Sequence, residues 1–160
     1  MLRISKLADY ATVVMSYMAR RPSDTYSAAR ISEQLDIGQP TVSKILKLLA
    51  HGGLLSAQRG VNGGYLLARP PGGITVAQII DAIEGIPVGL TECSSLPGVC
   101  EQESGCAIRG NWQRISQVVR RALEGVSLAD MALPKSAPVQ LFSREQMKEL
   151  PGRSRTGEQA

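Results

Sequence analysis

The sequence has little aromatic, histidine or cysteine content. Aromatic residues make up 4% of its 160 residues, with one tryptophan and one phenylalanine, and there is a single histidine. The hydrophobic fraction of 43% is still ample for a core, which we therefore expect to be aliphatic and mainly helical. No nucleophile–base pair, phosphate-binding loop or pair of catalytic carboxylates stands out. The sequence therefore predicts a protein that is not an enzyme.

Long apolar runs are also missing. No stretch approaches the ~20 apolar residues that cross a bilayer, so we expect no membrane partner. The first residues, MLRISKLADYA, carry charges and lack the continuous apolar stretch of a signal peptide. We therefore expect a cytoplasmic protein, whose thiols stay reduced and are available to bind metal or sense redox state.

The three cysteines of the chain, Cys93, Cys100 and Cys106, lie within fourteen residues of one another. Their spacing is wider than the Cys-x2-Cys pairs typical of structural zinc. The intervening residues are rich in serine, glycine and proline, so the loop can fold around a group larger than one ion. Thiolate ligands favour an iron–sulfur cluster. A zinc ion, or direct oxidation of the thiols without a cluster, are the alternatives.

Positive charge is absent from the middle of the chain. Residues 1–70 carry nine Lys and Arg against four Asp and Glu, whereas residues 71–107 carry five acids and no Lys or Arg. A basic segment followed by an acidic one that bears cysteines indicates a polyanion-binding part joined to a sensing part. A solvated surface charge is the simpler interpretation.

Hydrophobic spacing predicts three helices in the first third of the chain. They cover residues 6–20, with Ser5 as a candidate cap, residues 27–35, and a helix that starts near Pro40 and ends before Gly52-Gly53. Gly38, in the turn before the third helix, can adopt positive φ. The third helix has two distinct faces. Its core face is formed by Val42, Ile45, Leu46 and Leu49, and its outer face by Pro40, Ser43, Lys44, Lys47 and His51.

Two strand-like runs, at residues 54–59 and 65–69, flank a glycine-rich hairpin loop. Helix, short helix, turn, polar-faced helix and hairpin form the order of a winged helix-turn-helix. We therefore expect double-stranded DNA as the partner, although basic faces also occur on protein-interaction modules. The residues expected to contact DNA are Gln39, Thr41, Ser43, Lys44 and Lys47 on the third helix, and Arg59 and Asn62 on the hairpin.

Beyond the hairpin, Thr75 and Gln78 have capping-box spacing and open a helix that runs to about Glu84. After the cysteine loop, a near-heptad stripe predicts a long helix that needs a partner, most simply a second copy. The dimerisation residues expected there are Ile108, Ile115, Val118, Val119 and Ala122. We expect DNA binding from residues 1–73, a linker helix and cluster loop at 74–106, dimerisation through 107–133, and a mostly disordered tail at 134–160 with a short helix around 144–150.

The segment RGVNGGYLLARPPGGITVAQIIDAIEG at 59–85, followed by three spaced cysteines and a heptad helix, resembles the bacterial iron–sulfur winged-helix regulators of the IscR and NsrR type, an Rrf-type family. The resemblance extends from residue 1 to about 133. The opening LRISKLADYA and the short cysteine loop are most similar to the subgroup that regulates the SUF iron–sulfur assembly system. The resemblance implies a homodimeric regulator, expected to act as a repressor, with Cys93, Cys100 and Cys106 as cluster ligands. We expect a 2Fe–2S cluster in preference to 4Fe–4S.

The resemblance fails at one ligand position. IscR-like members have a histidine three residues after the third cysteine, where this chain has Arg109, whose guanidinium is a very poor ligand. The NsrR-like branch uses an acidic residue near the N-terminus of the partner subunit, and Asp9 occupies the corresponding place. Asp9 is therefore the candidate fourth ligand, with Glu92, Glu101 and Glu103 as local alternatives. A nitric oxide or redox sensor of the same fold remains the alternative function.

Overall fold

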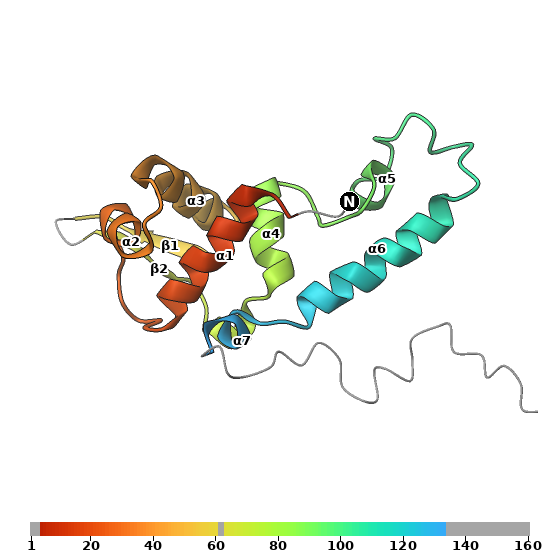
Figure 1. Ribbon diagram of the computed structural model, residues 1–160. Helices are drawn as coiled ribbons and strands as arrows, with labels where there is room; N and C mark the ends of the chain where they lie inside the picture. The colour runs from red at the N-terminus through yellow and green to blue at the C-terminus, as the bar shows by residue number, and fades with distance from the viewer. Residues whose placement is uncertain (1–3, 61–62, 134–160) are drawn as a thin grey trace, which may run out of the picture.

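The computed structural model describes residues 4–60 and 63–133. It confirms the expected fold class, because helices dominate and the strands form one hairpin. The elements, drawn in Figure 1, are α1 (Lys6–Ala19), α2 (Ala28–Leu35), α3 (Gln39–His51), β1 (Leu55–Gln58), β2 (Gly64–Leu67), the 3-10 turn η1 (Pro71–Gly73), α4 (Val76–Glu84), α5 (Glu92–Ser95), α6 (Arg109–Glu124) and α7 (Leu128–Ala132). The tail expected at 134–160 lies outside the described residues.

Local signals set the starts of several helices. The Ser5 hydroxyl accepts a hydrogen bond from the backbone N–H of Ala8 at 3.1 Å, as expected for the cap of α1. Ser27 caps α2 rather than belonging to it. Both hydrogen bonds of the Thr75–Gln78 capping box are present at the start of α4, at 3.1 and 3.3 Å. These helices therefore begin within a residue or two of the predicted positions.

The turn before α3 is built differently from the expectation. Asp36, not Gly38, takes the left-handed conformation, with φ of 54°, while Gly38 has φ of −50°. Aspartate tolerates this region better than most non-glycine residues. The Ser32 hydroxyl donates to the Ile37 carbonyl at 2.7 Å and stabilises the turn. Gly38 then serves as the residue from which α3 starts.

The wing is an antiparallel pair in which Leu55 lies opposite Leu67 and Gln58 opposite Gly64. Its strands are shorter than the predicted runs. The Tyr65 backbone also forms two hydrogen bonds with Tyr26, which precedes α2, at 2.8 and 2.9 Å. Gly64 permits this approach, because an added Cβ would lie 2.6 Å from the Tyr26 carbonyl oxygen. The wing is therefore fastened to the segment before α2.

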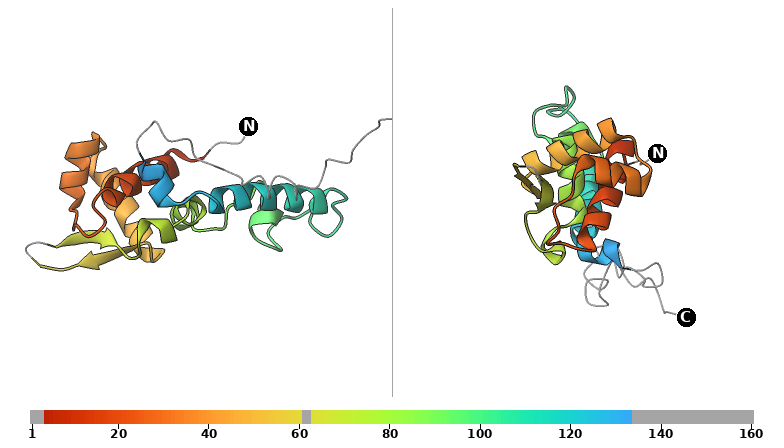
Figure 2. Two further views of the ribbon diagram at one scale, coloured as in Figure 1. Left: turned by 90° about the horizontal axis from the view of Figure 1, so that it is seen from below. Right: turned by 90° about the vertical axis from the view of Figure 1, so that its left-hand side faces the viewer.

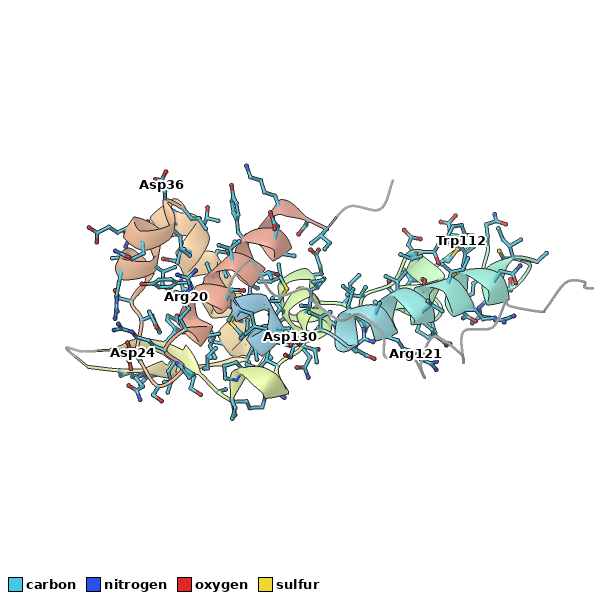
Figure 3. The ribbon with its side chains drawn as sticks, turned by 60° about the horizontal axis from the view of Figure 1, so that its bottom comes forward. Arg20, Asp24, Asp36, Trp112, Arg121 and Asp130 are labelled. Atoms are coloured by element: carbon cyan, nitrogen blue, oxygen red, sulfur yellow. The ribbon has the colours of Figure 1, made fainter. Side chains whose placement is uncertain are left out.

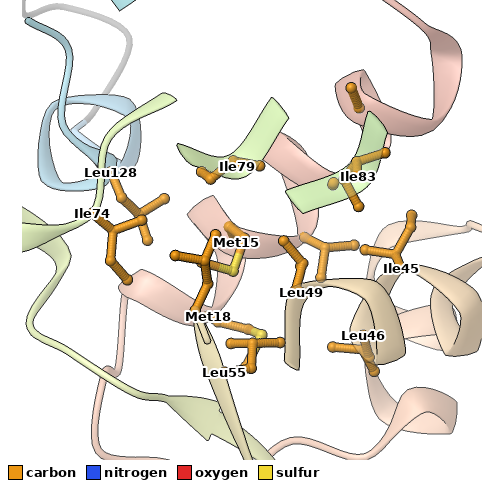
Figure 4. Close-up of a cluster of buried hydrophobic side chains, with 14 of the residues drawn as sticks. Met15, Met18, Ile45, Leu46, Leu49, Leu55, Ile74, Ile79, Ile83 and Leu128 are labelled. Carbon is orange, nitrogen blue, oxygen red and sulfur yellow. The ribbon is translucent and has the colours of Figure 1, made fainter. Parts of the chain in front are cut away.

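The core lies between α1, α3 and α4, with the hairpin and α7 closing its edges (Figure 4). Met15 and Met18 of α1 are fully buried against apolar side chains of the other elements. The predicted core face of α3 is confirmed, because Val42, Ile45, Leu46 and Leu49 are also fully buried. Long-range packing brings α3 and α4 close enough that a Cβ added at Gly52 would lie 2.6 Å from the Cβ of Ala82.

The segment after α6 returns to this core, which the sequence did not lead us to expect. The long helix ends at Glu124, and the backbone N–H of Val76 donates to the Val126 carbonyl at 3.0 Å. The N–H of Leu128 donates to the Ile74 carbonyl at 2.7 Å, and the Leu128 side chain is fully buried. Residues 126–132 therefore pack on α1 and η1 rather than extending α6.

The cysteine loop and α6 form an arm that projects from the winged-helix body (Figures 1 and 2). Its base is the junction of α4 with α6, and α5 packs on α6 farther out. No helix in the described part of the chain is long and apolar enough to cross a membrane. The molecule thus separates a basic body from an arm that carries all three cysteines.

Candidate DNA-binding surface and cysteine loop

The outer face of α3 presents polar and basic side chains to solvent. Gln39, Lys44 and Lys47 are exposed, and Thr41 and Ser43 are half-buried at the edge of that face. Burial of the opposite face fixes α3 on the body and leaves this row free to enter a major groove, where such side chains contact base edges and phosphates. All five residues predicted on α3 are thus at least partly exposed.

The wing supplies a second cationic position. Arg59 follows β1 and is exposed, and the loop it opens contains Gly60 with φ of 123°. Asn62, predicted to contact DNA beside Arg59, lies outside the described residues. A cation at the tip of a hairpin is well placed to contact the backbone or minor groove beside a helix that lies in the major groove.

Three further arginines, which the sequence analysis did not single out, lie near α2. Arg20 and Arg21 follow α1 and are exposed, and Figure 3 labels Arg20 on the body. Arg30 stacks over the Tyr26 ring, with 4.9 Å from its guanidinium carbon to the ring centroid. Only the excess of basic residues over 1–70 pointed to them, because none belongs to the third helix or the hairpin.

The three thiols differ in exposure but share one loop. Cys93 lies in α5 and is buried, whereas Cys100 and Cys106 are half-buried in the irregular segment between α5 and α6. All three are free. Within residues 4–60 and 63–133, no three His, Cys, Asp or Glu side chains are gathered to hold a single metal ion. The structure therefore brings the cysteines to one loop without assembling them into a metal site.

These donors fit an iron–sulfur cluster by their chemistry. Free thiols become thiolates, which iron in such clusters prefers, and the loop between Cys93 and Cys106 contains no helix beyond Ser95 and no strand. Its few backbone hydrogen bonds are turns, such as Glu103 N–H to the Cys100 carbonyl at 3.0 Å. Regular structure therefore does not hold the sulfurs of Cys100 and Cys106 apart.

Glu103 and Arg109 form an ion pair inside the loop. The Glu103 carboxylate lies 2.5 Å from the Arg109 guanidinium and accepts the Gly98 N–H, also at 2.5 Å. The Glu103 side chain is only 11% exposed, and Arg109 has a buried Nε that finds no partner among the described residues. Arg109, which occupies the histidine position of IscR-like proteins, thus engages one of the local alternatives to Asp9.

The other candidates for a fourth ligand are free of such contacts among the described residues. Glu92 and Glu101 are exposed on the loop, and Asp9 is exposed in the first turn of α1. Asp9 belongs to the body, and no cysteine of the same chain gathers with it to hold a metal ion. Its candidacy therefore rests on a partner subunit, as the resemblance implies.

A chain of hydroxyl groups connects Cys93 to α6. Ser116 is buried, with 4% of its surface exposed, and its hydroxyl accepts the Leu90 N–H at 3.1 Å and donates to the Ser94 hydroxyl at 2.8 Å. The Thr91 hydroxyl lies 2.9 Å from that of Ser94 and 3.4 Å from the Cys93 sulfur. The sequence did not predict these contacts, because the hydrogen bond between Ser116 and Ser94 joins residues of two different helices.

One side of α6 is apolar and exposed to solvent. Ile108, which immediately precedes the helix, is 55% exposed, Ile115 47% and Val118 40%. Val119 and Ala122 are half-buried. Trp112, labelled in Figure 3, is 38% exposed and joins this face, although the sequence analysis did not name it. These residues follow helical spacing, so one stripe runs along the arm.

An ion pair connects the arm to the body. Arg120 of α6 donates two hydrogen bonds to the Asp81 carboxylate of α4, at 2.8 and 3.3 Å, and a third contact, from Nε, reaches Glu124 at 2.8 Å. The Asp81 hydrogen bond is the main reason that the pKa of Arg120 is raised above its usual value. Asp81 also accepts the Val88 N–H at 2.7 Å, at the start of the segment that leads to the cysteines.

Known proteins of similar sequence and structure include DNA-binding regulators. The HTH-type transcriptional regulator IscR of Xenorhabdus nematophila is 30% identical over 131 residues, which cover 81% of this chain and 79% of that protein. A putative HTH-type transcriptional regulator, ORF2, of Azotobacter vinelandii matches with the same identity and coverage. The solved structure of CymR, the global cysteine regulator of B. subtilis, is 28% identical, has a TM-score of 0.63, and covers 82% of this chain and 97% of its own.

The family comparison covers the body and the arm together. The model of the Rrf2 family, described as an iron-dependent transcriptional regulator, matches residues 4–133, so it includes the winged helix, the cysteine loop and α6. The match ends where the described residues end, at Leu133. On this match, and on the 30% identity to IscR over most of its length, the chain belongs to the Rrf2 family of transcriptional regulators.

Proposed function

We propose that this protein is a homodimeric repressor whose affinity for an operator depends on an iron–sulfur cluster bound by Cys93, Cys100 and Cys106. The observation that carries the proposal is the position of the cysteine loop. It lies between α4, which packs on the DNA-facing helix α3, and α6, which presents the unpaired apolar stripe. A change in the loop can therefore act on both the DNA-binding body and the pairing surface.

The chain's own residues divide this work. Lys44, Lys47 and Arg59 bring positive charge to the DNA, and the buried face of α3 keeps that charge in register with the wing. The thiolates hold the cluster, which supplies reversible occupancy in response to iron, redox state or nitric oxide. The Asp81–Arg120 pair transmits the position of α6 to α4. Ligand occupancy has to change the operator affinity by only about 1–3 kcal/mol to act as a switch.

Dimerisation would cover the exposed stripe of α6 and supply a fourth ligand to the cysteine loop. A second copy of α6 would cover Ile108, Trp112, Ile115 and Val118, which are otherwise exposed at 38–55%. In this dimer we propose Asp9 of the partner subunit as the fourth cluster ligand, as the resemblance to the NsrR-like branch implies. Three thiolates and one carboxylate hold iron less firmly than four thiolates, because iron–sulfur iron favours sulfur. Such a cluster is readily lost, which suits a sensor.

The finer assignments rest on the resemblance of the sequence to IscR-type regulators. We propose a 2Fe–2S cluster in preference to 4Fe–4S, and genes of SUF iron–sulfur assembly as the targets. The family description as iron-dependent supports an iron cofactor.

A thiol-based sensor without a cluster is the second candidate. It is favoured by the half-buried and free state of Cys100 and Cys106, which leaves both within reach of an oxidant. CymR of B. subtilis, named as a global cysteine regulator, shares this fold. The solved structure of CymR from Staphylococcus aureus in an oxidised form is 25% identical to this chain and has a TM-score of 0.61. Oxidation would then replace cluster loss as the event that changes the loop.

Anaerobic purification followed by iron and sulfide analysis separates the two candidates. The proposal predicts stoichiometric iron and sulfide, visible absorption, and a dimer in native mass spectrometry. Replacing each cysteine in turn with alanine should remove the colour, whereas Ser104→Ala, in the same loop, should keep it. Asp9→Ala should change the spectrum or shorten the lifetime of the cluster. A colourless, iron-free protein that still binds DNA would refute the cluster and favour direct thiol oxidation.

A further inference from the structure

The hydroxyl chain Thr91–Ser94–Ser116 contains more hydrogen-bond donors than one of its members can accept. Three donors lie within hydrogen-bond distance of the Ser94 oxygen: the Thr91 N–H at 2.9 Å, the Ser116 hydroxyl at 2.8 Å and the Thr91 hydroxyl at 2.9 Å. A hydroxyl oxygen has two lone pairs and accepts at most two such bonds well. One of the three donors must therefore point elsewhere.

The remaining contacts decide which donor is displaced. The Thr91 N–H is part of the backbone and cannot turn away. The Ser116 oxygen already accepts the Leu90 N–H at 3.1 Å, and Ser94 is the partner toward which its proton points. The Ser94 proton itself goes to the Thr91 carbonyl at 2.8 Å. The Thr91 hydroxyl is the donor left over, and its other partner is the Cys93 sulfur at 3.4 Å, within the range of a sulfur hydrogen bond.

We infer that Thr91 is a positioning residue for the cluster: its hydroxyl donates a hydrogen bond to the Cys93 sulfur, and Ser116 of α6 directs that proton by occupying Ser94. The inference rests on the proposed function, because it concerns Cys93 as a ligand. Cys93 is the one buried thiol among the described cysteines, so water does not compete with Thr91 as it can at half-buried Cys100 and Cys106.

Such a hydrogen bond has a predictable electronic effect. A donor to a ligand sulfur withdraws negative charge from it and makes an added electron on the bound cluster less costly, so the reduction potential rises. The donor is set by Ser116, which is buried on α6 next to the exposed stripe that includes Ile115 and Val118. A change in the position of α6 would therefore alter the hydrogen bond to the Cys93 sulfur through the hydroxyl groups of Ser94 and Thr91.

Three variants of the full-length, anaerobically purified dimer test the inference. Thr91→Val keeps the shape of the side chain and removes the hydroxyl, so the midpoint potential of the cluster should fall. Thr91→Ser restores a hydroxyl and should return the potential to the wild-type value. Ser116→Ala frees a lone pair on Ser94, so the Thr91 hydroxyl turns toward Ser94, and the potential should fall in the same direction.

Two spectroscopic readouts accompany the potential. In resonance Raman spectra, the iron–cysteine stretching bands of the wild type should shift when the protein is exchanged into deuterium oxide, and this isotope shift should shrink in Thr91→Val. In the cluster-free protein, Ser116→Ala should accelerate amide hydrogen exchange at Leu90, whereas Thr91→Val should leave it unchanged. Far-ultraviolet circular dichroism confirms that each variant is folded.

The outcomes separate the inference from the function on which it rests. A wild-type protein that assembles no cluster, or a Cys93→Ala variant with undiminished iron, overturns the cluster function and the inference together. A normal wild-type cluster with the same potential and the same deuterium shift in Thr91→Val overturns the inference alone. A lowered potential that Thr91→Ser fails to restore would also overturn it, because the effect would then follow from packing.

Discussion

Arg120 and Asp81, thirty-nine residues apart in sequence, form a two-pronged ion pair in which both guanidinium amino groups reach the carboxylate, at 2.8 and 3.3 Å. This pair joins α6 to α4, and α4 packs on both α1 and α3. The Asp81 carboxylate also accepts a hydrogen bond from the Val88 N–H, at the start of the segment that leads to the cysteine loop. The arm and the body therefore share one electrostatic junction.

Breaking this junction should destabilise the protein measurably. Arg120→Gln removes a charge-assisted pair whose side chains are only 31% and 25% exposed, so we expect a loss of about 1 kcal/mol in the free energy of unfolding. Urea denaturation measures it. Arg121→Gln, at the exposed neighbouring position labelled in Figure 3, is the matched control and should change little. Equal losses in both variants would mean that the junction contributes no specific stability.

The contact between α3 and α4 should tolerate no added atom. Gly52→Ala places a methyl group 2.6 Å from the Cβ of Ala82, so we expect a loss of about 1–3 kcal/mol and weaker operator binding. Gly38→Ala, at the other end of α3, meets nothing within 4 Å and should stay within about 0.5 kcal/mol of wild type. Thermal unfolding of the pair compares them directly. A stable Gly52→Ala protein would show that α3 and α4 can separate without cost.

The basic face of α3 should contribute affinity that depends on salt. Lys47→Ala should weaken binding to all duplexes to a similar extent and lower the slope of log affinity against log salt by about 1 if Lys47 contacts a phosphate. Arg114→Ala, exposed on α6, is the control and should leave the slope unchanged. Fluorescence anisotropy over a salt series provides both slopes. Identical slopes for Lys47→Ala and wild type would show that Lys47 contacts no phosphate.

Docking of α7 should weaken in acid. Hydrogen bonds from Ser127, first its hydroxyl and then its backbone N–H, hold the pKa of Asp130 below its usual value. A lowered folded-state pKa contributes stability that is present above the unfolded pKa, near 4, and is lost as pH falls through the folded value. Asp130, labelled in Figure 3, therefore stabilises the protein at neutral pH.

The variant Asp130→Asn isolates this contribution. We expect it to be less stable than wild type by about 0.5 kcal/mol at pH 6, and we expect this difference to be lost at an acid pH below the lowered, folded-state pKa of Asp130. Urea unfolding at the two pH values measures the difference. A difference that is constant with pH would show that the charge of Asp130 is not responsible.

Local signals explain how much of this fold could be predicted. The Ser5 cap and the Thr75–Gln78 capping box are set by residues three apart, so the sequence identifies them directly. The two faces of α3 follow from helical spacing alone. Positive φ was expected at Gly38, because glycine adopts it most readily. In the structure Asp36 has this conformation instead, in a turn closed by the Ser32–Ile37 hydrogen bond.

Contacts between distant segments escaped prediction. The Val126–Val76 and Leu128–Ile74 backbone hydrogen bonds join segments about fifty residues apart, and no local sequence pattern predicts them. The Ser116–Ser94 hydrogen bond likewise depends on how α5 docks on α6. Cysteine spacing identified the donors, but whether their sulfurs meet depends on the loop, on the Glu103–Arg109 pair and on a partner subunit.

The most direct test of the central claim compares operator affinity with and without the cluster. The duplex is one that the protein selects from a random pool, and the anaerobic dimer is titrated before and after the cluster is removed, at one fixed salt concentration. We predict a difference in Kd of about fivefold or more. Cys93→Ala should bind like the cluster-free form. Equal affinity of the two forms would contradict the account, because the cysteine loop would then not control the DNA-binding surface.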